Sequence, residues 1–279
     1  MEQSKERLEI LNKIKEYESL GGEYFYKDVE NDPESKELKP EDVDYLYKKF
    51  KNKFKNLKGR YMGYRLRKFA KKFYQVEIKG LENLPKLNTG AIITGNHFAP
   101  LESICETLVC KKINKHKRMF IVIKEGNFQM PGRYGYLFKY CDTLPLSSNM
   151  HTMQNFNKAV SEVLKKKHFI LVYPEQAMWW NYEKPRPHQK GAAYIAVKNN
   201  VPIVPCFVTL ENQDKLDNEG FPVKKYTVNI LKTIYPDPNK TFKQNVQEMT
   251  ENNYMQCVNK YEEVYQKKLV YGDVHEESI

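Results

Sequence analysis

Short apolar runs alternate with amphipathic stretches along most of the chain. The runs that predict β-strands are 74–79, 91–95, 119–123, 169–173, 203–209 and 226–231. Between them, apolar residues recur at steps of three and four, which is the helical period. The clearest helix is 152–167, and others are expected near 190–200 and 241–268. Strands that alternate with helices predict an α/β fold in which helices flank a mainly parallel mixed sheet.

The N-terminal part of the chain has a different pattern. A charged helix is expected over about 4–19, followed by a break at Gly21 and Gly22 and an acidic stretch. No shift of composition marks a boundary after Gly80. The predicted organisation is a charged accessory arm at 1–40, basic amphipathic helices at 41–74 and a catalytic-type domain at 75–279.

The charge of the protein is concentrated in the segment from Lys48 to Lys72. The formal net charge is +11, and this segment holds twelve Lys and Arg residues and no acid. Its large apolar side chains recur mostly at steps of three and four: Phe50, Phe54, Leu57, Tyr61, Tyr64, Phe69 and Phe73. This spacing predicts one amphipathic helix, or two short helices that meet near Gly59.

A basic helix with an aromatic stripe is typical of an element that lies on an anionic membrane surface. The residues expected to contact that surface are Lys51, Phe54, Lys55, Tyr61, Arg65 and Phe69. Two alternatives remain open. The stripe packs on the body of the protein, or the segment follows a nucleic-acid backbone with its aromatic rings as stacking platforms. No zinc-finger spacing or RNA-recognition signature favours nucleic acid.

Other features of the sequence predict where the protein works. No stretch of 18 residues lacks charge, and the first residues contain no apolar signal core. Five cysteines without a Cys-x-x-Cys pair fit reduced thiols better than disulfides or a zinc site. We therefore expect a cytoplasmic protein that is peripheral on the inner face of the membrane.

Three polar clusters follow predicted strands. Asn96 and His97 follow 91–95, Lys124 follows 119–123, and Glu175 and Gln176 follow 169–173. The carboxyl ends of parallel strands form one edge of a sheet, where the working residues of such folds lie.

His97 and Glu102 are the candidates for proton transfer. The loop before the next helix can fold back so that Glu102, expected in the first turn of that helix, reaches Nδ1 of His97. The carboxylate would then fix the tautomer in which Nε2 accepts a proton from a substrate hydroxyl.

These clusters, in this order, resemble the signatures of the glycerolipid acyltransferases typified by 1-acyl-sn-glycerol-3-phosphate acyltransferase, over about 74–235. The first signature, Asn-His-x4-Asp, is similar to Asn96-His97-x4-Glu102. The third, Pro-Glu-Gly-Thr-Arg, is similar to Pro174-Glu175-Gln176-Ala177-Met178. The remaining matches are Lys124-Glu125 through Pro131 and Gly135 to Thr143-Leu-Pro-Leu146, then Lys190-Gly191-Ala192 and Val201-Pro202-Ile203-Val204-Pro205.

The resemblance implies a glycerol-3-phosphate acyltransferase-like fold and a reaction. His97 would be the general base that activates a lysophospholipid hydroxyl for attack on an acyl-CoA or acyl carrier protein thioester, and Glu102 would orient it. The acyl thioester is a co-substrate, and neither a cofactor nor a metal is implied. The implied substrate-binding residues are Asn96, Lys124, Glu175, Gln176, Lys190 and Gly191.

The chain departs from the family pattern where arginines are expected. Ser147 and Ser148 stand at the end of the second signature, and Met178 ends the third. In the family these arginines are associated with the acceptor's phosphate, so their loss removes bidentate phosphate recognition. Four bases follow the third signature: Lys184, Arg186, His188 and Lys190. They are expected either to restore the positive charge that the missing arginines would supply or to form a solvated loop.

Several alternatives follow from these departures. Trp179 and Trp180 line a substrate pocket, lie at the membrane interface or pack in the core. The protein could also be a non-catalytic lipid- or nucleic-acid-binding protein that retains the fold. An esterase that uses Ser103 is a further alternative with little support.

Overall fold

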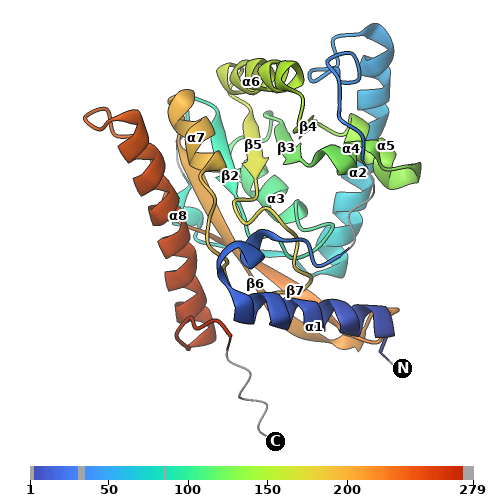
Figure 1. Cartoon of the computed structure of the whole chain (residues 1–279), viewed down its shortest axis with the longest axis vertical. Coiled ribbons are helices and arrows are strands. Elements are labelled where there is room, and N and C mark those ends of the chain that lie inside the picture. The colour runs from blue at the N-terminus through green and yellow to red at the C-terminus, as the bar shows by residue number, and fades with distance from the viewer. Residues whose placement is uncertain (1–2, 31–34, 85, 273–279) are drawn as a thin grey trace, which may run out of the picture.

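The computed structural model describes residues 3–30, 35–84 and 86–272, so parts of the predicted 1–40 and 75–279 segments lie outside the described residues. Within these ranges, seven strands form one sheet with the order β1-β7-β6-β2-β5-β3-β4 (Figure 1). The strands are β1 (Glu77–Lys79), β2 (Ala91–Thr94), β3 (Met119–Ile123), β4 (Thr143–Pro145), β5 (Phe169–Val172), β6 (Ile203–Leu216) and β7 (Pro222–Ile230). Neighbours run parallel except for the β6–β7 pair. The predicted fold class is therefore confirmed.

Helices flank this sheet and account for most of the rest of the chain. The α-helices are α1 (Lys5–Leu20), α2 (Phe50–Phe73), α3 (Ile104–Ile113), α4 (Glu125–Gln129), α5 (Gly132–Tyr140), α6 (Met150–Lys165), α7 (Gly191–Lys198) and α8 (Phe242–Tyr265). Two short 3-10 helices are η1 (Gly22–Tyr26) and η2 (Leu81–Asn83). The capping box at Thr241 and Gln244 is present at the start of α8.

Two predicted strands have different limits in the structure. The run 74–79 is a strand only at Glu77–Lys79, because Tyr74 caps the end of α2 and Gln75 adopts a left-handed φ of 46°. The strand β6 continues beyond 209 to Leu216, where it forms a long hairpin with β7.

Side chains of alternating strand positions build a core on each face of the sheet. Ile92 and Ile170 pack with Phe156 of α6 on one face. Ile93 and Leu171 pack with α3 on the other face. The four residues of β2 are all buried, as expected for a central strand covered on both faces.

The basic segment forms one continuous helix, α2, which runs through Gly59 without a break. Its small residues face α5. A Cβ on Gly59 would lie 2.5 Å from the carbonyl oxygen of Tyr140, and a Cβ on Gly63 would lie 2.6 Å from Sγ of Cys141. The buried Asn56 donates to Oδ1 of Asp142 at 2.8 Å. Larger side chains along this face would push α2 away from the body of the protein.

The opposite side of α2 leaves its aromatic stripe in solvent. Six side chains of the stripe are between 57% and 75% exposed: Phe50, Phe54, Leu57, Tyr61, Tyr64 and Phe69. The alternative in which the stripe packs on the body is therefore wrong for these six residues. Lys55 also differs from its prediction as a membrane contact, because it is half-buried and donates to the Tyr140 hydroxyl at 3.1 Å.

The N-terminal arm packs on the rest of the protein. Phe25 and Val29 join Ala177 and Trp179 in one buried cluster. The backbone N–H of Ser4 donates to Glu219 at the β6–β7 hairpin, and Figure 1 shows α1 beside these two strands. None of the helices in the described ranges is both long enough and apolar enough to cross a bilayer.

Candidate active site

The three polar clusters lie along the carboxyl edge of the sheet, as predicted. Thr94 at the end of β2 pairs with Val172 at the end of β5, and Ile121 of β3 pairs with Leu171 of β5. Adjacent strands are about 4.8 Å apart, so the segments that follow β2 and β5 are direct neighbours.

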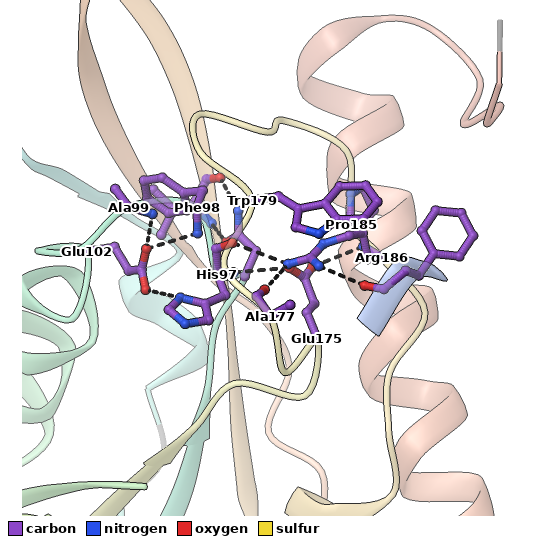
Figure 2. A network of polar contacts seen from close by, with 12 residues as sticks. His97, Phe98, Ala99, Glu102, Glu175, Ala177, Trp179, Pro185 and Arg186 are labelled. Carbon is purple, nitrogen blue, oxygen red and sulfur yellow. Dashed lines mark hydrogen bonds and ion pairs between the residues drawn. The ribbon is translucent and has the colours of Figure 1, made fainter. Parts of the chain in front are cut away.

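His97 and Glu102 form the predicted pair. His97 Nδ1 lies 2.5 Å from Oε1 of Glu102. The other oxygen, Oε2, accepts the backbone N–H of Phe98 at 2.9 Å and also that of Ala99 (Figure 2). Glu102 is only 2% exposed, whereas the His97 side chain is 23% exposed. With Nδ1 directed at the carboxylate, the Nε2 lone pair is left to accept a proton.

The position of Glu102 differs from the prediction in one respect. It lies in a turn, and α3 begins two residues later at Ile104. The Glu102 N–H donates to Ala99 and its carbonyl accepts from Cys105, so the turn is closed on both sides. This fold-back brings the carboxylate to the imidazole, and it accommodates the extra methylene of Glu relative to Asp.

Tyr173 covers one face of the His97 ring. Its ring is stacked on that of His97 with a centroid separation of 4.3 Å and an interplanar angle of 6°. Burial raises the pKa of the Tyr173 phenol well above its ordinary value, so the hydroxyl stays protonated. Sequence analysis did not identify this contact, although Tyr173 immediately precedes the Pro174-Glu175 signature.

Glu175 supports the site from within the protein. Its Oε2 accepts the His97 N–H at 3.0 Å and pairs with Nη2 of Arg186 at 2.9 Å. Its Oε1 accepts the Arg186 N–H at 3.0 Å. The side chain is 2% exposed and both oxygens are engaged, so Glu175 holds the loop in this structure, and its contact with substrate stays a prediction.

Asn96 is also structural. Its side chain is buried and bonds to both polar groups of one backbone residue, accepting from the Val208 N–H at 2.8 Å and donating to the Val208 carbonyl at 3.0 Å. The amide thus continues the pairing between β2 and β6 past the end of β2. As for Glu175, a contact between Asn96 and substrate stays a prediction.

The remaining predicted substrate-binding residues lie outside this network. Gln176 is exposed and has a φ of 65°, a left-handed conformation that the glycine of the family signature adopts without strain. Lys190 and Gly191 are exposed at the start of α7. Lys124 follows β3 and forms an ion pair with Asp28 of the N-terminal arm.

The serines that replace the second-signature arginine bind a neighbouring acid. Ser147 Oγ lies 2.8 Å from Glu125 Oε1, and Ser148 Oγ lies 3.3 Å from Glu125 Oε2. Leu38 of the arm donates its N–H to the same carboxylate. The Glu125 carboxylate therefore links the segment after β4 to the N-terminal arm, and its donors are two hydroxyl groups and one backbone N–H, all uncharged.

Among the bases that follow the third signature Lys190 is exposed, but Lys184, Arg186 and His188 do not form a solvated loop. Lys184 pairs with Glu18 at 2.5 Å, and Arg186 is fully buried against Glu175. Burial lowers the pKa of His188 to about 3, so this imidazole is neutral. Both proposed roles for the group, phosphate attraction and solvation, are wrong for Arg186.

The two tryptophans are packing residues. Trp179 is fully buried between rings of the N-terminal arm, and its Nε1 donates to the Lys27 carbonyl at 3.0 Å. Trp180 packs edge-on against Phe221, and the Arg7 guanidinium lies over its ring. The packing alternative for both residues is confirmed.

A second acid, Glu106, lies behind the His97–Glu102 pair. It is fully buried on α3, and neither of its carboxylate oxygens has a hydrogen-bond partner in the described part of the chain. Burial raises its pKa well above the ordinary value of 4.5, and the nearby Glu102 raises it further. Glu106 is therefore a neutral carboxylic acid in the folded protein.

Other candidate chemistry receives no support from the geometry. Ser103 is half-buried just before α3, and no hydrogen bond among the described residues joins its hydroxyl to His97. Within residues 3–30, 35–84 and 86–272, no three His, Cys, Asp or Glu side chains gather in a way that could hold a metal ion.

Comparison with known proteins shows what the chain resembles. Residues 75–209 match the family model described as Acyltransferase. The chain is 28% identical over 149 residues, 53% of its length, to 1-acyl-sn-glycerol-3-phosphate acyltransferase BAT2, chloroplastic, of Brassica napus. It is equally similar, over the same share of its length, to the LPAT1 chloroplastic enzyme of that name from Arabidopsis thaliana. These matches cover 40% and 39% of the two relatives, so the chain spans well under half of their length.

A solved structure also matches most of the chain. The 1-acyl-sn-glycerophosphate (LPA) acyltransferase PlsC from Thermotoga maritima is 18% identical, with a TM-score of 0.48, and the match covers 78% of this chain and 83% of that one. The resemblance rests on the sequence matches and on the ordered signatures. Residues 75–209, just under half of the chain, match the acyltransferase family model, and the resemblance to the glycerolipid acyltransferases is confirmed.

Proposed function

We propose that this protein is a membrane-peripheral O-acyltransferase that moves a fatty acyl group from a thioester to the hydroxyl of a lysophospholipid. The observation that carries the proposal is the 2.5 Å contact between His97 Nδ1 and the buried Glu102 carboxylate, beside an imidazole that is partly open to solvent. The names of the relatives, 1-acyl-sn-glycerol-3-phosphate acyltransferases, support a lysophospholipid as the acceptor class.

The reaction follows from the roles of these two side chains. Nε2 of His97 accepts the proton of the acceptor hydroxyl while the hydroxyl oxygen attacks the thioester carbonyl. The tetrahedral intermediate collapses, the carbon–sulfur bond breaks, and the imidazolium returns its proton to the departing thiolate. Glu102 stabilises the imidazolium between these steps, and general-base catalysis of this kind contributes about 10²–10⁴ in rate.

The acyl donor in this proposal is acyl-CoA or acyl carrier protein. Either thioester delivers the same acyl carbonyl to the edge of the sheet, and the thiol product makes the reaction easy to follow. The predicted phosphate on the acceptor has to be recognised without the two signature arginines. Two bases that follow the third signature are already engaged by acids: Arg186 is paired with Glu175, and Lys184 is paired with Glu18. Another group therefore has to recognise the phosphate.

The exposed face of α2 supports a peripheral location at an anionic membrane surface. Phe54, Tyr61 and Phe69 stand in solvent beside the exposed Lys51 and Arg65. Each Lys or Arg near anionic lipid contributes about 1 kcal/mol, and the aromatic rings add apolar contact. The inner, cytoplasmic face is the side of a membrane on which anionic lipids attract basic segments.

A pair of histidine variants tests the activity. Purified protein is incubated with lysolipids and an acyl-CoA or acyl carrier protein thioester, and released thiol and acylated lipid are measured. His97→Ala should lower acyl transfer by about a hundredfold or more while binding to anionic vesicles is retained. His116→Ala is the matched control, because His116 is an exposed loop residue.

Two outcomes would contradict the proposal. Near-full activity of His97→Ala would remove this residue from the mechanism. Absence of thiol release by the unmodified protein with every donor and acceptor would favour the non-catalytic binding protein.

A further inference from the structure

A fully buried guanidinium lies directly behind the catalytic loop. Arg186 has no exposed surface, and its Cζ lies 4.5 Å from the centroid of the Trp179 ring. Nη1 donates to the carbonyl of Phe25 at 2.8 Å. Nη2 donates to Oε2 of Glu175 at 2.9 Å, to the carbonyl of His97 at 3.3 Å and to the carbonyl of Ala177 (Figure 2).

Stability alone does not account for this arrangement. Taking two charges out of water is costly, and a buried ion pair is often no more stabilising than apolar residues of the same volume. Nε of Arg186 also has no hydrogen-bond partner among the described residues. The pair between Arg186 and Glu175 therefore calls for another explanation.

The contacts of the pair converge on one residue of the backbone. Glu175 accepts the N–H of His97, and Arg186 donates to the carbonyl of His97. Glu175 also accepts the backbone N–H of Arg186, so a second contact fixes the position of the two charged residues relative to each other. The ion pair thus contacts both polar groups of the His97 main chain, and the carbonyl also accepts the Trp179 N–H at 3.0 Å.

Such fixing matters because general-base catalysis depends on geometry. The imidazole has to lie within hydrogen-bond reach of the hydroxyl, and a displacement of about 1 Å can cost about a hundredfold in rate. Lysine could not replace Arg186, because its ammonium is a point charge, whereas the planar fork of arginine reaches several acceptors at once.

We infer that Arg186 is a positioning residue for His97: paired with Glu175, it fixes the His97 backbone and ties it to the Phe25 carbonyl of the N-terminal arm. This inference rests on the proposed function only for the role of His97 in proton transfer. On this inference the N-terminal arm, which precedes the matched residues 75–209, helps Arg186 and Glu175 to hold His97 in place.

Three variants separate positioning from a merely structural role. Arg186→Lys keeps the charge and loses the fork. Arg186→Met leaves the Glu175 carboxylate buried without its partner. The double variant Arg186→Met with Glu175→Gln removes both charges. For each variant the melting temperature, kcat and the KM for the thioester are measured.

The expected results differ between the two roles. Arg186→Lys should lower kcat at least tenfold and change KM less than twofold. The double variant should melt at a higher temperature than Arg186→Met and keep a low kcat. If Arg186→Met does not fold, the other two variants still decide the question. Two results would overturn the inference. One is a double variant in which kcat recovers together with the melting temperature, and the other is an unchanged kcat in Arg186→Lys.

Nitrogen NMR of the His97 ring gives a readout that does not depend on turnover. The unmodified protein should show a single tautomer with Nδ1 protonated, and Arg186→Lys should show a shifted or divided resonance. An unchanged resonance would overturn the inference even if no substrate were found. Lys184→Met is the matched control, because it removes an ion pair with Glu18 from the same loop and should leave kcat and the resonance unchanged.

Discussion

The carboxyl group of Glu106 lies against the backbone of Gly95. A Cβ at position 95 would collide with Oε1 of Glu106, so any residue other than glycine there would require the buried Glu106 side chain to move. Gly95 directly precedes Asn96 and His97. This acid therefore packs against the residue that joins β2 to Asn96 and His97, within the same buried region as Glu102.

The first prediction concerns the protonation of Glu106. In the unfolded chain this carboxyl loses its proton near its ordinary pKa of 4.5, whereas the folded protein keeps the proton to a higher pH. Unfolding thus releases a proton, and stability falls as the pH rises from 4.5 towards the folded-state pKa, by about 1.4 kcal/mol per pH unit. Glu106→Gln, which carries no ionisable group, should escape this loss.

Urea unfolding of both proteins at several pH values between about 5 and 7 tests this prediction. The advantage of Glu106→Gln over the unmodified protein should grow as the pH rises. A difference that stays constant across this range would show that Glu106 is not a protonated acid in the folded state.

The second prediction concerns the exposed stripe of α2. Phe54 and Tyr61 are each 60% exposed, so replacing both by serine should leave the melting temperature nearly unchanged. Binding to vesicles that contain anionic lipid should weaken at least tenfold, because the rings no longer enter the interface. Co-sedimentation at low and moderate salt measures the effect.

The matched control replaces two exposed rings elsewhere, Tyr194 and Tyr235, by serine. This variant should bind vesicles like the unmodified protein. Duplex or single-stranded DNA added at fixed salt should compete poorly with the vesicles. Equal loss of binding in the control, or displacement by DNA at lower concentration than lipid, would contradict the assignment of this face to a membrane.

The third prediction concerns the backbone at Gln176. Its φ of 65° disfavours any side chain with a Cβ, by about 1–2 kcal/mol. Gln176→Gly should relieve this strain, and the larger freedom of glycine in the unfolded chain should offset part of the gain. We expect a net stabilisation of about 0.5–1 kcal/mol in urea unfolding. Gln176→Ala, which keeps the Cβ, should show no gain, and equal stability of the two variants would contradict the argument.

Much of the candidate site was predictable because it follows from local rules. Apolar runs identified every strand of the described residues except β4 (Thr143–Pro145), which was not predicted. The rule that parallel strands share a carboxyl edge brought the three polar clusters together. The pairing of His97 with Glu102 follows from a short loop. The stripe of α2 was also visible, although its spacing alone did not decide whether the stripe or the face of Gly59 and Gly63 packs inside.

The sequence did not reveal the contacts that join distant parts of the chain. Arg186 donates to Phe25, which lies 161 residues earlier, and Asn96 binds Val208, which lies 112 residues later. Nothing in the neighbourhood of either residue signals these partners. Asn96 and Glu175 lie within the signatures and are predicted to bind substrate, whereas in the structure their side chains hold the backbone of Val208 and His97.

The two sides of α2 tolerate different substitutions. The side that meets α5 accepts only small residues at Gly59 and Gly63, because an added carbon would strike the neighbouring segment. On the outward side Phe54 and Phe69 are each 60% exposed, and their ring contacts are with Phe50 and Phe73 of the same helix. If this side binds a bilayer, as proposed, substitutions there would change the strength or the lipid preference of that binding and leave the pairing of His97 with Glu102 intact.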